Sequence, residues 1–198
     1  SNGPIIIDEN ATLDIGVLVK GPVYIGKNSI INPGAKIRGP VSIGPFCKVG
    51  GEVEDSIIQA FSNKQHDGFL GHSYIGEWVN LGANTNTSDL KNNYSNIRMK
   101  LNNDKEIETN KMFIGSIIGD FSSTAISTKL NSGTHVGTGA NIFTAGFQDK
   151  YVYPFSWGLE GKVGLNRFLK KCQIIMDRRG EALSESLKNR LINLWKMS

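Results

Sequence analysis

The stretch IDENATLDIGVLVKGPVYIGKNSIINPGAKIRGPVSIGPFCKVGGEV, residues 7–53, decides the fold of this chain. Aliphatic side chains recur in it every six residues without a break, at Ile7, Leu13, Val19, Ile25, Ile31, Ile37, Ile43 and Val49. A small or β-branched residue stands four positions after each of them, at Ala11, Val17, Val23, Ser29, Ala35, Val41, Cys47 and Val53. A helix needs a period of 3.6 and a hairpin meander needs strict alternation, so neither template fits. The period of six predicts one short strand and one corner per repeat.

Three repeats of this kind fit one triangular coil of a parallel solenoid, with neighbouring coils about 4.8 Å apart. The repeat shifts register near Gly50 and Gly51. It then resumes, with predicted inward residues at Ile57, Asn63, Phe69, Ile75, Leu81 and Thr87. A third run has its predicted inward residues at Met112, Ile118, Thr124, Leu130, Val136 and Ile142. Together the three runs predict an all-β solenoid of about six to seven coils.

The composition divides the chain into a solenoid over residues 4–146 and a tail over residues 147–198. Residues 88–111 are polar and lack the repeat, and the segment is too long for a corner, so we expect an extruded loop there. The tail begins with an aromatic crossing segment and continues with two helical patterns, the second with Ser184 as its expected N-cap. Their apolar stripes are Leu165, Phe168, Leu169, Cys172 and Met176, then Leu183, Leu187, Leu191 and Leu194. We expect these stripes to pack against the solenoid or a neighbouring subunit.

The overall composition narrows the functional classes. The net charge of +4 is spread along 198 residues without a basic run, which argues against a nucleic-acid partner. No apolar run approaches the roughly 18 residues of a membrane span, and two distant cysteines favour a reducing compartment, so we expect a soluble cytoplasmic protein. Residues 1–3 resemble an expression remnant, and we expect that a domain preceding the solenoid has been removed.

The three histidines do not form an obvious metal site. His66 and His72 lie six residues apart, which in a three-sided coil places them on successive faces, and His135 occupies another position of the repeat. They cannot readily share one metal within a subunit, so we expect no metal. For His72 and His135 we expect ordinary exposed positions on the solenoid.

The segment HDGFLGHSYIGEWVNLGANT, residues 66–85, resembles the acetyltransferase domain of bifunctional N-acetylglucosamine-1-phosphate uridyltransferases. The similarity continues through IIGDFSSTAISTKLNSGTHVG, residues 117–137, and covers roughly residues 50–146. These proteins form part of the hexapeptide-repeat acyltransferase superfamily. The resemblance implies a left-handed parallel β-helix, a homotrimer and an attached sugar-1-phosphate nucleotidyltransferase domain.

The resemblance also implies a reaction, the transfer of an acetyl group from acetyl-CoA to the amine of a sugar 1-phosphate such as glucosamine 1-phosphate. His66 falls on the catalytic base of the family, a role that suits a side chain whose pKa lies near neutrality. The backbone N–H of Ala83 falls where the family stabilises the oxyanion. Asp89 replaces a neutral amide of the family, and a carboxylate there could orient His66 or raise its pKa.

Further residues are expected to bind the two substrates. Asn80, Phe69 and Lys91 are expected to contact the amino sugar phosphate. Ala83, Asn84, Thr144 and Ala145 are expected to contact acetyl-CoA.

Two alternatives stay open because the chain departs from the family pattern. Asn84 stands where the family has glycine, and Asn32 stands where the family has a phosphate-binding arginine, which removes a charge-assisted contact. One alternative is a solenoid without catalytic activity that trimerises or regulates a nucleotidyltransferase. The other is an O-acyltransferase that acts on small molecules.

Overall fold

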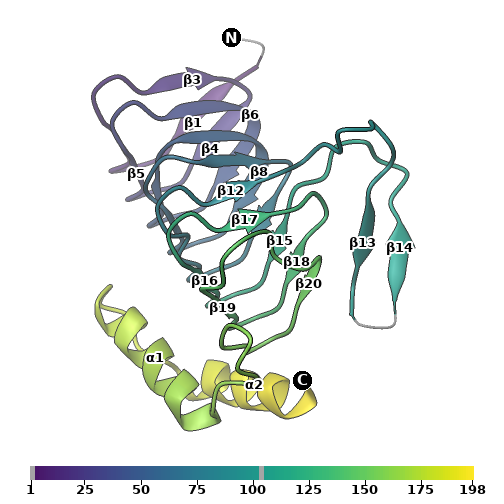
Figure 1. Cartoon of the computed structure of the whole chain (residues 1–198). Coiled ribbons are helices and arrows are strands. Elements are labelled where there is room, and N and C mark those ends of the chain that lie inside the picture. The colour runs from purple at the N-terminus through teal and green to yellow at the C-terminus, as the bar shows by residue number, and fades with distance from the viewer. Residues whose placement is uncertain (1–2, 103–104) are drawn as a thin grey trace.

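A computed structural model describes residues 3–102 and 105–198, so Ser1 and Asn2 of the expected expression remnant lie outside the described residues. The chain winds into a three-sided solenoid of parallel strands (Figure 1). The first face shows about eight turns. Its strands are, in spatial order, β1 (Ile5–Ile7), β4 (Val23–Ile25), the second half of β6 (Lys36–Ile43), the second half of β8 (Glu52–Ile58), β11 (Tyr74–Ile75), β15 (Ile117–Ile118), β18 (His135–Val136) and β20 (Tyr151–Val152).

The other two faces carry shorter strands. The second face consists of β2 (Thr12–Leu13), β5 (Ile30–Ile31), β7 (Lys48–Val49), β9 (Asn63–Lys64), β16 (Ser123–Thr124) and β19 (Asn141–Ile142). The third face consists of β3 (Leu18–Lys20), the first halves of β6 and β8, β10 (Phe69–Gly71), β12 (Asn86–Thr87) and β17 (Lys129–Leu130). Strands that are neighbours on a face pair in parallel from one coil to the next. The predicted β-solenoid is therefore confirmed, while its left hand is implied only by the family resemblance.

Stacked aliphatic side chains fill the interior of the solenoid. Ile25 pairs with Ile43, Ile43 pairs with Ile58, and all three are almost fully buried. Ile7 occupies the same column in the terminal coil and is 48% exposed, because no further coil covers it. Each buried isoleucine removes enough apolar surface from water to stabilise the fold by about 1.5–3 kcal/mol.

The fourth coil consists of the second half of β8, then β9 and β10. Its predicted register is wrong by one residue. Ile57, Asn63 and Phe69 were expected to face inward, but the buried residues are their successors Ile58, Lys64 and Leu70. The shift arises at the corner between the third and first faces, where two residues of β6, 39 and 40, lie opposite a single residue of β8, at position 55. Because this corner is one residue shorter, the inward positions that follow it shift by one residue.

The predicted register returns in the fifth coil. Ile75, Leu81 and Thr87 are buried as expected, and so are Ile118 and Leu130 in the sixth coil. Met112, by contrast, is 41% exposed and lies before the first strand of its coil. The repeat thus resumes only after the extruded segment has ended.

The solenoid extends past residue 146, the expected end. Val136 of β18 pairs with Val152 of β20, and Asn141 forms an isolated bridge with Trp157. Residues 147–157 therefore add another turn, which is why the expected six to seven coils are too few. Aromatic side chains take the place of the hexapeptide pattern in this turn, so periodicity could not reveal it.

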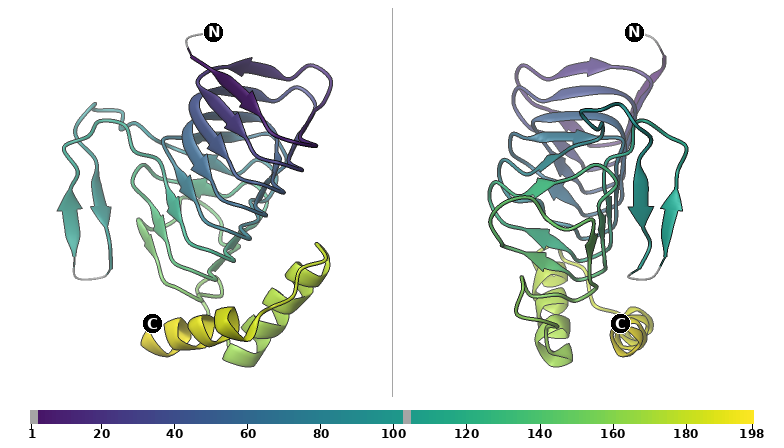
Figure 2. Two further views of the ribbon diagram at one scale, coloured as in Figure 1. Left: turned by 180° about the vertical axis from the view of Figure 1, so that it is seen from behind. Right: turned by 45° about the vertical axis from the view of Figure 1, so that its right-hand side comes forward.

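Two helices follow, α1 (Leu165–Asp177) and α2 (Glu185–Met197). Figure 2 shows both at the C-terminal end of the solenoid, with α1 directed back along it. Phe168, Cys172 and Met176 of α1 are buried, and Ser184 caps α2 by accepting a hydrogen bond from the backbone N–H of Leu187. Burial raises the pKa of the Cys172 thiol to about 12, which leaves it unreactive. In the described residues, no helix is long and apolar enough to cross a membrane.

An aromatic ladder forms the surface on which α1 packs. Four aromatic side chains occupy the corner between the first and second faces in successive coils, namely Phe46, Phe61, Trp78 and Phe121. Ring centroids lie 4.9 Å apart for Phe46 and Phe61 and 4.1 Å apart for Phe61 and Trp78. Phe168 meets Phe121 edge to face, so α1 is attached to the ladder rather than to the aliphatic core.

The segment between the fifth and sixth coils leaves the solenoid as a hairpin. Its antiparallel strands are β13 (Arg98–Lys100) and β14 (Glu106–Glu108). Figures 1 and 2 show the hairpin beside the solenoid, near the later coils. The ammonium of Lys150 donates to the carbonyl of Arg98, and His135 Nδ1 lies 3.3 Å from the carbonyl of Lys100. The hairpin is thereby attached to its own subunit.

Candidate functional site

His66 lies at the corner between the second and third faces in the fourth coil, here named the His66 corner (residues 65–68). Its side chain is exposed and makes no hydrogen bond or ion pair with any residue in 3–102 or 105–198. Its carbonyl accepts a hydrogen bond from the ammonium of Lys64, at 2.8 Å. Lys64 also donates to the carbonyl of Gly50, at 3.0 Å. An inward lysine therefore holds this corner from inside the solenoid.

Lys64 is the one residue of its column that carries a charge where neighbouring coils have Val49 and Leu81. It is 4% exposed, and burial lowers the pKa of its ammonium to about 8. Asn63 was expected in this inward slot, and the one-residue shift replaces it with lysine. The two carbonyl contacts offset part of the cost of burying this amine.

Gly68 brings the next coil close to His66. Its φ of +125° is a conformation that side chains disfavour, and a Cβ at this position would lie 2.2 Å from the carbonyl oxygen of Thr85. The backbone N–H of Asn84 donates to the carbonyl of Asp67, at 2.9 Å. Ala83 and Asn84 therefore occupy the same corner as His66, one coil further on.

Ala83 presents a free backbone donor at this corner. Its carbonyl accepts from the N–H of Ser127, but its own N–H has no hydrogen-bond partner among the described residues. Asn84 adopts a left-handed conformation with φ of +56°, and its side-chain amide donates to the hydroxyl of Ser127, at 3.1 Å. A free N–H and an exposed imidazole therefore occupy the same corner in adjacent coils, while the oxyanion-stabilising and base roles of Ala83 and His66 stay predictions.

Clefts flank the His66 corner on both sides. On the second face, a cleft of about 410 Å³ has Gln65 and Asn80 in its lining. On the third face, a groove of about 350 Å³ has Asp67, Phe69 and Asn84 in its lining. The corner thus separates two recesses. The fold brings His66, Asn80, Ala83, Asn84 and Phe69 of the expected site residues into one region of the surface.

Thr144 and Ala145 lie on the same corner in the seventh coil, after β19 and before Phe147, which bridges to Lys129. The hydroxyl of Thr144 donates to Gln148 Oε1 at 2.6 Å, and Ala145 is exposed. Two coil spacings, about 10 Å, separate them from Ala83. A ligand that contacts both groups must therefore extend along the corner.

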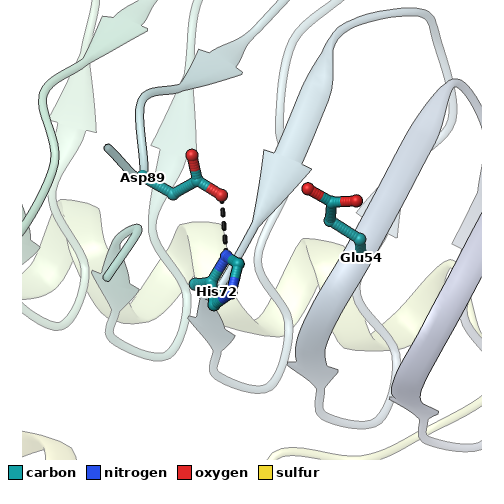
Figure 3. Close-up of side chains that lie close together, drawn as sticks. All are labelled: Glu54, His72 and Asp89. Atoms are coloured by element: carbon teal, nitrogen blue, oxygen red, sulfur yellow. Dashed lines mark hydrogen bonds and ion pairs between the residues drawn. The ribbon is translucent and has the colours of Figure 1, made fainter. Parts of the chain in front are cut away.

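Asp89 does not approach His66. His66 precedes β10 and Asp89 follows β12, and these strands lie side by side, so the two residues are at opposite ends of the third face. Asp89 Oδ2 lies 2.7 Å from Nδ1 of His72 (Figure 3). An ionised carboxylate only accepts, so Nδ1 is the donor of this hydrogen bond. The expected role of Asp89 as a partner of His66 is therefore ruled out within this subunit.

His72 is not the freely exposed histidine that the sequence predicts. Its ring is half-buried and stacks on Phe113 with centroids 5.1 Å apart. It occupies the corner between the third and first faces, here named the His72 corner (residues 72 and 89 with positions 54 and 55 of the preceding coil). One coil spans 17–18 residues here, and Asp89 follows His72 by 17. That spacing is the signal that could have predicted the pair.

The His72 corner also carries the only group of potential metal ligands found in the described residues. Glu54, His72 and Asp89 each offer a ligand atom within 4.8 Å of the others, as Figure 3 shows for their arrangement. Asp55 Oδ2 lies 3.8 Å from Nε2 of His72. Arg38 already forms an ion pair with Glu54 at 2.6 Å, so one of the carboxylates has its charge compensated.

Two other residues singled out in the sequence serve local structure. Lys91 lies in the extruded segment and donates to the carbonyl of Asn96 at 2.6 Å, so this subunit does not bring its ammonium to Asn80 or Phe69. Asn32 donates through its amide to the carbonyl of Gln65, at 2.8 Å. It thus supports the His66 corner without providing a positive charge.

The repeat and the three-sided parallel fold define a hexapeptide-repeat solenoid. Residues 4–39 match the family described as "Bacterial transferase hexapeptide (six repeats)". The resemblance of this chain to hexapeptide-repeat transferases is thereby confirmed.

Two groups of relatives share longer segments. The chain is 32% identical over 98 residues to the "Bifunctional sugar-1-phosphate nucleotidylyltransferase/acetyltransferase" of Sulfurisphaera tokodaii, covering 48% of this chain and 24% of the relative. It is 31% identical over 91 residues to the "Bifunctional protein GlmU" of Methanococcus aeolicus, covering 46% of this chain and 22% of the relative. The matched segments thus span about a quarter of the length of these relatives.

One solved structure covers nearly the whole chain. It is a hexapeptide transferase family protein from Anaplasma phagocytophilum, and the alignment covers 96% of this chain and 90% of that chain. The sequence identity is 17% and the TM-score is 0.24.

Proposed function

We propose that this chain is an acetyl-CoA-dependent acyltransferase that acetylates the amine of an amino sugar 1-phosphate. The observation that carries the proposal is the geometry of the His66 corner, which separates two clefts and exposes the side chain of His66. The free N–H of Ala83 lies on the same corner in the next coil. Both relatives are named as bifunctional proteins, and one name includes an acetyltransferase.

The proposed chemistry assigns one step to each group. The amine attacks the thioester carbonyl carbon, so a C–N bond forms, and His66 takes the proton that the nitrogen loses. The N–H of Ala83 stabilises the negative charge on the carbonyl oxygen. The C–S bond then breaks, and the proton held by His66 returns to the leaving sulfur as CoA.

The cysteines support direct transfer without an acyl-enzyme. Cys47 is completely buried, and burial raises the pKa of its thiol to about 11. Cys172 is buried on the inner side of α1. Neither thiol offers the exposed thiolate that an acyl-enzyme requires.

We further propose a homotrimer that completes the site. Outward side chains at one position of the first face form a largely apolar column, with Ile6, Tyr24, Ile57, Tyr74 and Ile117 all at least 36% exposed and Ser42 between Tyr24 and Ile57. An exposed, largely apolar stripe is typical of a protein interface. In a trimer, the extruded segment of one subunit could bring Lys91 to the His66 corner of another. Light scattering should give three times the chain mass, and Ile57→Asp should reduce it.

The test of the reaction is the release of free CoA from acetyl-CoA. We expect release with glucosamine 1-phosphate, and much less with glucosamine or without an acceptor. We also expect acetyl-CoA to raise the Tm, because a ligand that binds only the folded state stabilises it. A chain that shows neither effect would instead be the non-catalytic solenoid, and release with hydroxyl acceptors alone would indicate an O-acyltransferase.

A further inference from the structure

A second feature of the second face is independent of the His66 imidazole. Outward polar side chains follow one register position through four coils, from Lys48 to Asn63, Asn80 and Ser123. The C-terminal end of α1 lies over this column, because Nη2 of Arg179 donates to Asn63 Oδ1 at 2.7 Å. The space between them is the cleft of about 410 Å³, here named the basic cleft.

Three cations line the basic cleft from two different elements. Lys48 comes from β7 of the solenoid, and Arg178 and Arg179 follow the last turn of α1. Within residues 3–102 and 105–198, none of the three pairs with a carboxylate, although five other ion pairs between lysine or arginine and a carboxylate occur. The side chains of Lys48 and Arg178 make no hydrogen bond with those residues either. The cleft therefore concentrates positive charge without a protein counter-ion.

Helix stability alone does not account for this cluster. Cations near a helix C-terminus interact favourably with its dipole, which gives a reason for arginine at 178 and 179. Lys48 lies some 130 residues away in sequence, on the solenoid, and reaches the same cleft only because α1 packs over its strand. Like charges brought together in a recess repel one another unless an anion binds between them.

The remaining lining suits a small phosphorylated molecule. The amides of Asn63, Gln65 and Asn80 and the hydroxyl of Ser123 offer hydrogen bonds, while Phe61, Trp78 and Ile175 provide an apolar wall. The volume falls in the range of small-molecule sites. Arg179 is held in place by Asn63 and by the carbonyl of Phe46, so one guanidinium is already positioned.

We propose that the basic cleft binds the phosphate group of a small phosphorylated molecule, with Lys48, Arg178 and Arg179 as the anion-binding residues. Guanidinium groups bind phosphate through paired hydrogen bonds, and lysine adds a point charge. The site does not depend on acyl transfer. A phosphate ester without an amine should bind in it as well.

The experiment is a calorimetric titration with glucose 1-phosphate, which lacks an amine and cannot be an acetyl acceptor. We expect binding, with glucose itself showing none. Arg178→Gln and Lys48→Gln should each weaken binding about tenfold or more, as expected for one lost charge-assisted contact. Neither side chain makes a hydrogen bond or ion pair with the described residues, so Lys48→Gln should keep nearly the wild-type Tm, and Arg178→Gln should lower it only by the small loss of its interaction with the helix dipole.

The matched control is Lys170→Gln, which removes one charge from an exposed position of α1 that does not line the cleft. It should change the affinity less than about twofold, because exposed charges at a distance are screened by salt. The proposal is overturned if about 10 mM glucose 1-phosphate does not bind. It is also overturned if the three variants weaken binding equally, or if Arg178→Gln and Lys48→Gln bind like the wild type.

Discussion

The two corners of the fourth coil, at either end of β10, carry a histidine each and differ in how that histidine is held. His66 is exposed and unpaired among the described residues, with structural support only from its backbone. His72 is half-buried, bonded to Asp89 and stacked on Phe113. A base that must meet a substrate needs an accessible nitrogen, whereas the partners of His72 connect the solenoid to the base of the extruded segment. The difference indicates that His72, which is paired, has a structural role. His66, which is free among the described residues, is the better candidate for catalysis.

The largest expected effect follows from this contrast. His66→Ala should lower kcat/KM for acetyl transfer by about 10²–10⁴-fold, since it removes the proposed general base. His72→Ala should lower it less than about tenfold, through local disorder alone. Steady-state CoA release with glucosamine 1-phosphate measures both. The reverse order of effects would make the His72–Asp89 pair the base, with Nε2 as the reacting nitrogen.

Both corners owe their positions to the shifted register of the fourth coil, which a pair of adjacent substitutions can test. Ile58→Ala removes a buried side chain and should lower the free energy of unfolding by about 2–5 kcal/mol. Ile57→Ala alters an outward residue of the same type and should cost less than about 1 kcal/mol in the monomer. Urea unfolding of the two variants compares them under matched conditions, at a protein concentration at which light scattering gives the mass of the monomer. Equal losses would refute the register seen here.

The contrast also shows how far the sequence alone could predict this molecule. A strict period of six is sufficient to predict the solenoid, because it places an inward aliphatic residue at the same position of every repeat. Contacts between residues of neighbouring coils are harder to predict from the sequence, since they depend on the number of residues in each coil. The one-residue difference at position 55 moved Lys64 into the core and Asn63 out of it.

The candidate site was only partly predictable for the same reason. His66, Ala83 and Asn84 share one corner because they are linked by unbroken repeats. Asp89 was assigned to His66 by resemblance, but it lies one coil length after His72, which becomes informative only when the coil length is known. Arg178 and Arg179 could not be placed from sequence at all, because the packing of α1 on the aromatic ladder decides where that helix ends.

A smaller effect is a pH dependence of the free energy of unfolding that arises at the His66 corner. Lys64 beneath the His66 corner has its pKa lowered from an ordinary value near 10.5 to about 8. Below pH 8 its amine is protonated in both the folded and the unfolded chain. Between pH 8 and 10.5 only the unfolded chain keeps the proton, so stability should rise with pH, by up to about 3 kcal/mol.

Lys64→Met should flatten this rise when unfolding is measured between pH 7 and 10.5. Lys171, whose pKa is also lowered to about 8 by burial, titrates in the same window, so the difference between wild type and variant isolates Lys64. Lys171→Met provides the matched comparison, because it removes the other contribution and leaves the His66 corner intact. An unchanged slope in Lys64→Met would mean that the amine is not desolvated in solution.

The smallest effect concerns the side chains of the two corners themselves. Asp89→Ala removes a charged hydrogen bond from a half-buried ring and should cost about 1–3 kcal/mol. His66→Ala removes an exposed side chain that makes no hydrogen bond or ion pair with the described residues, and should change stability by less than about 0.5 kcal/mol. Thermal unfolding at pH 7 resolves the difference. If His66→Ala destabilised the chain as much as Asp89→Ala, then His66 would have a structural partner in solution, such as a neighbouring subunit, and its freedom as a base would have to be judged in the assembly.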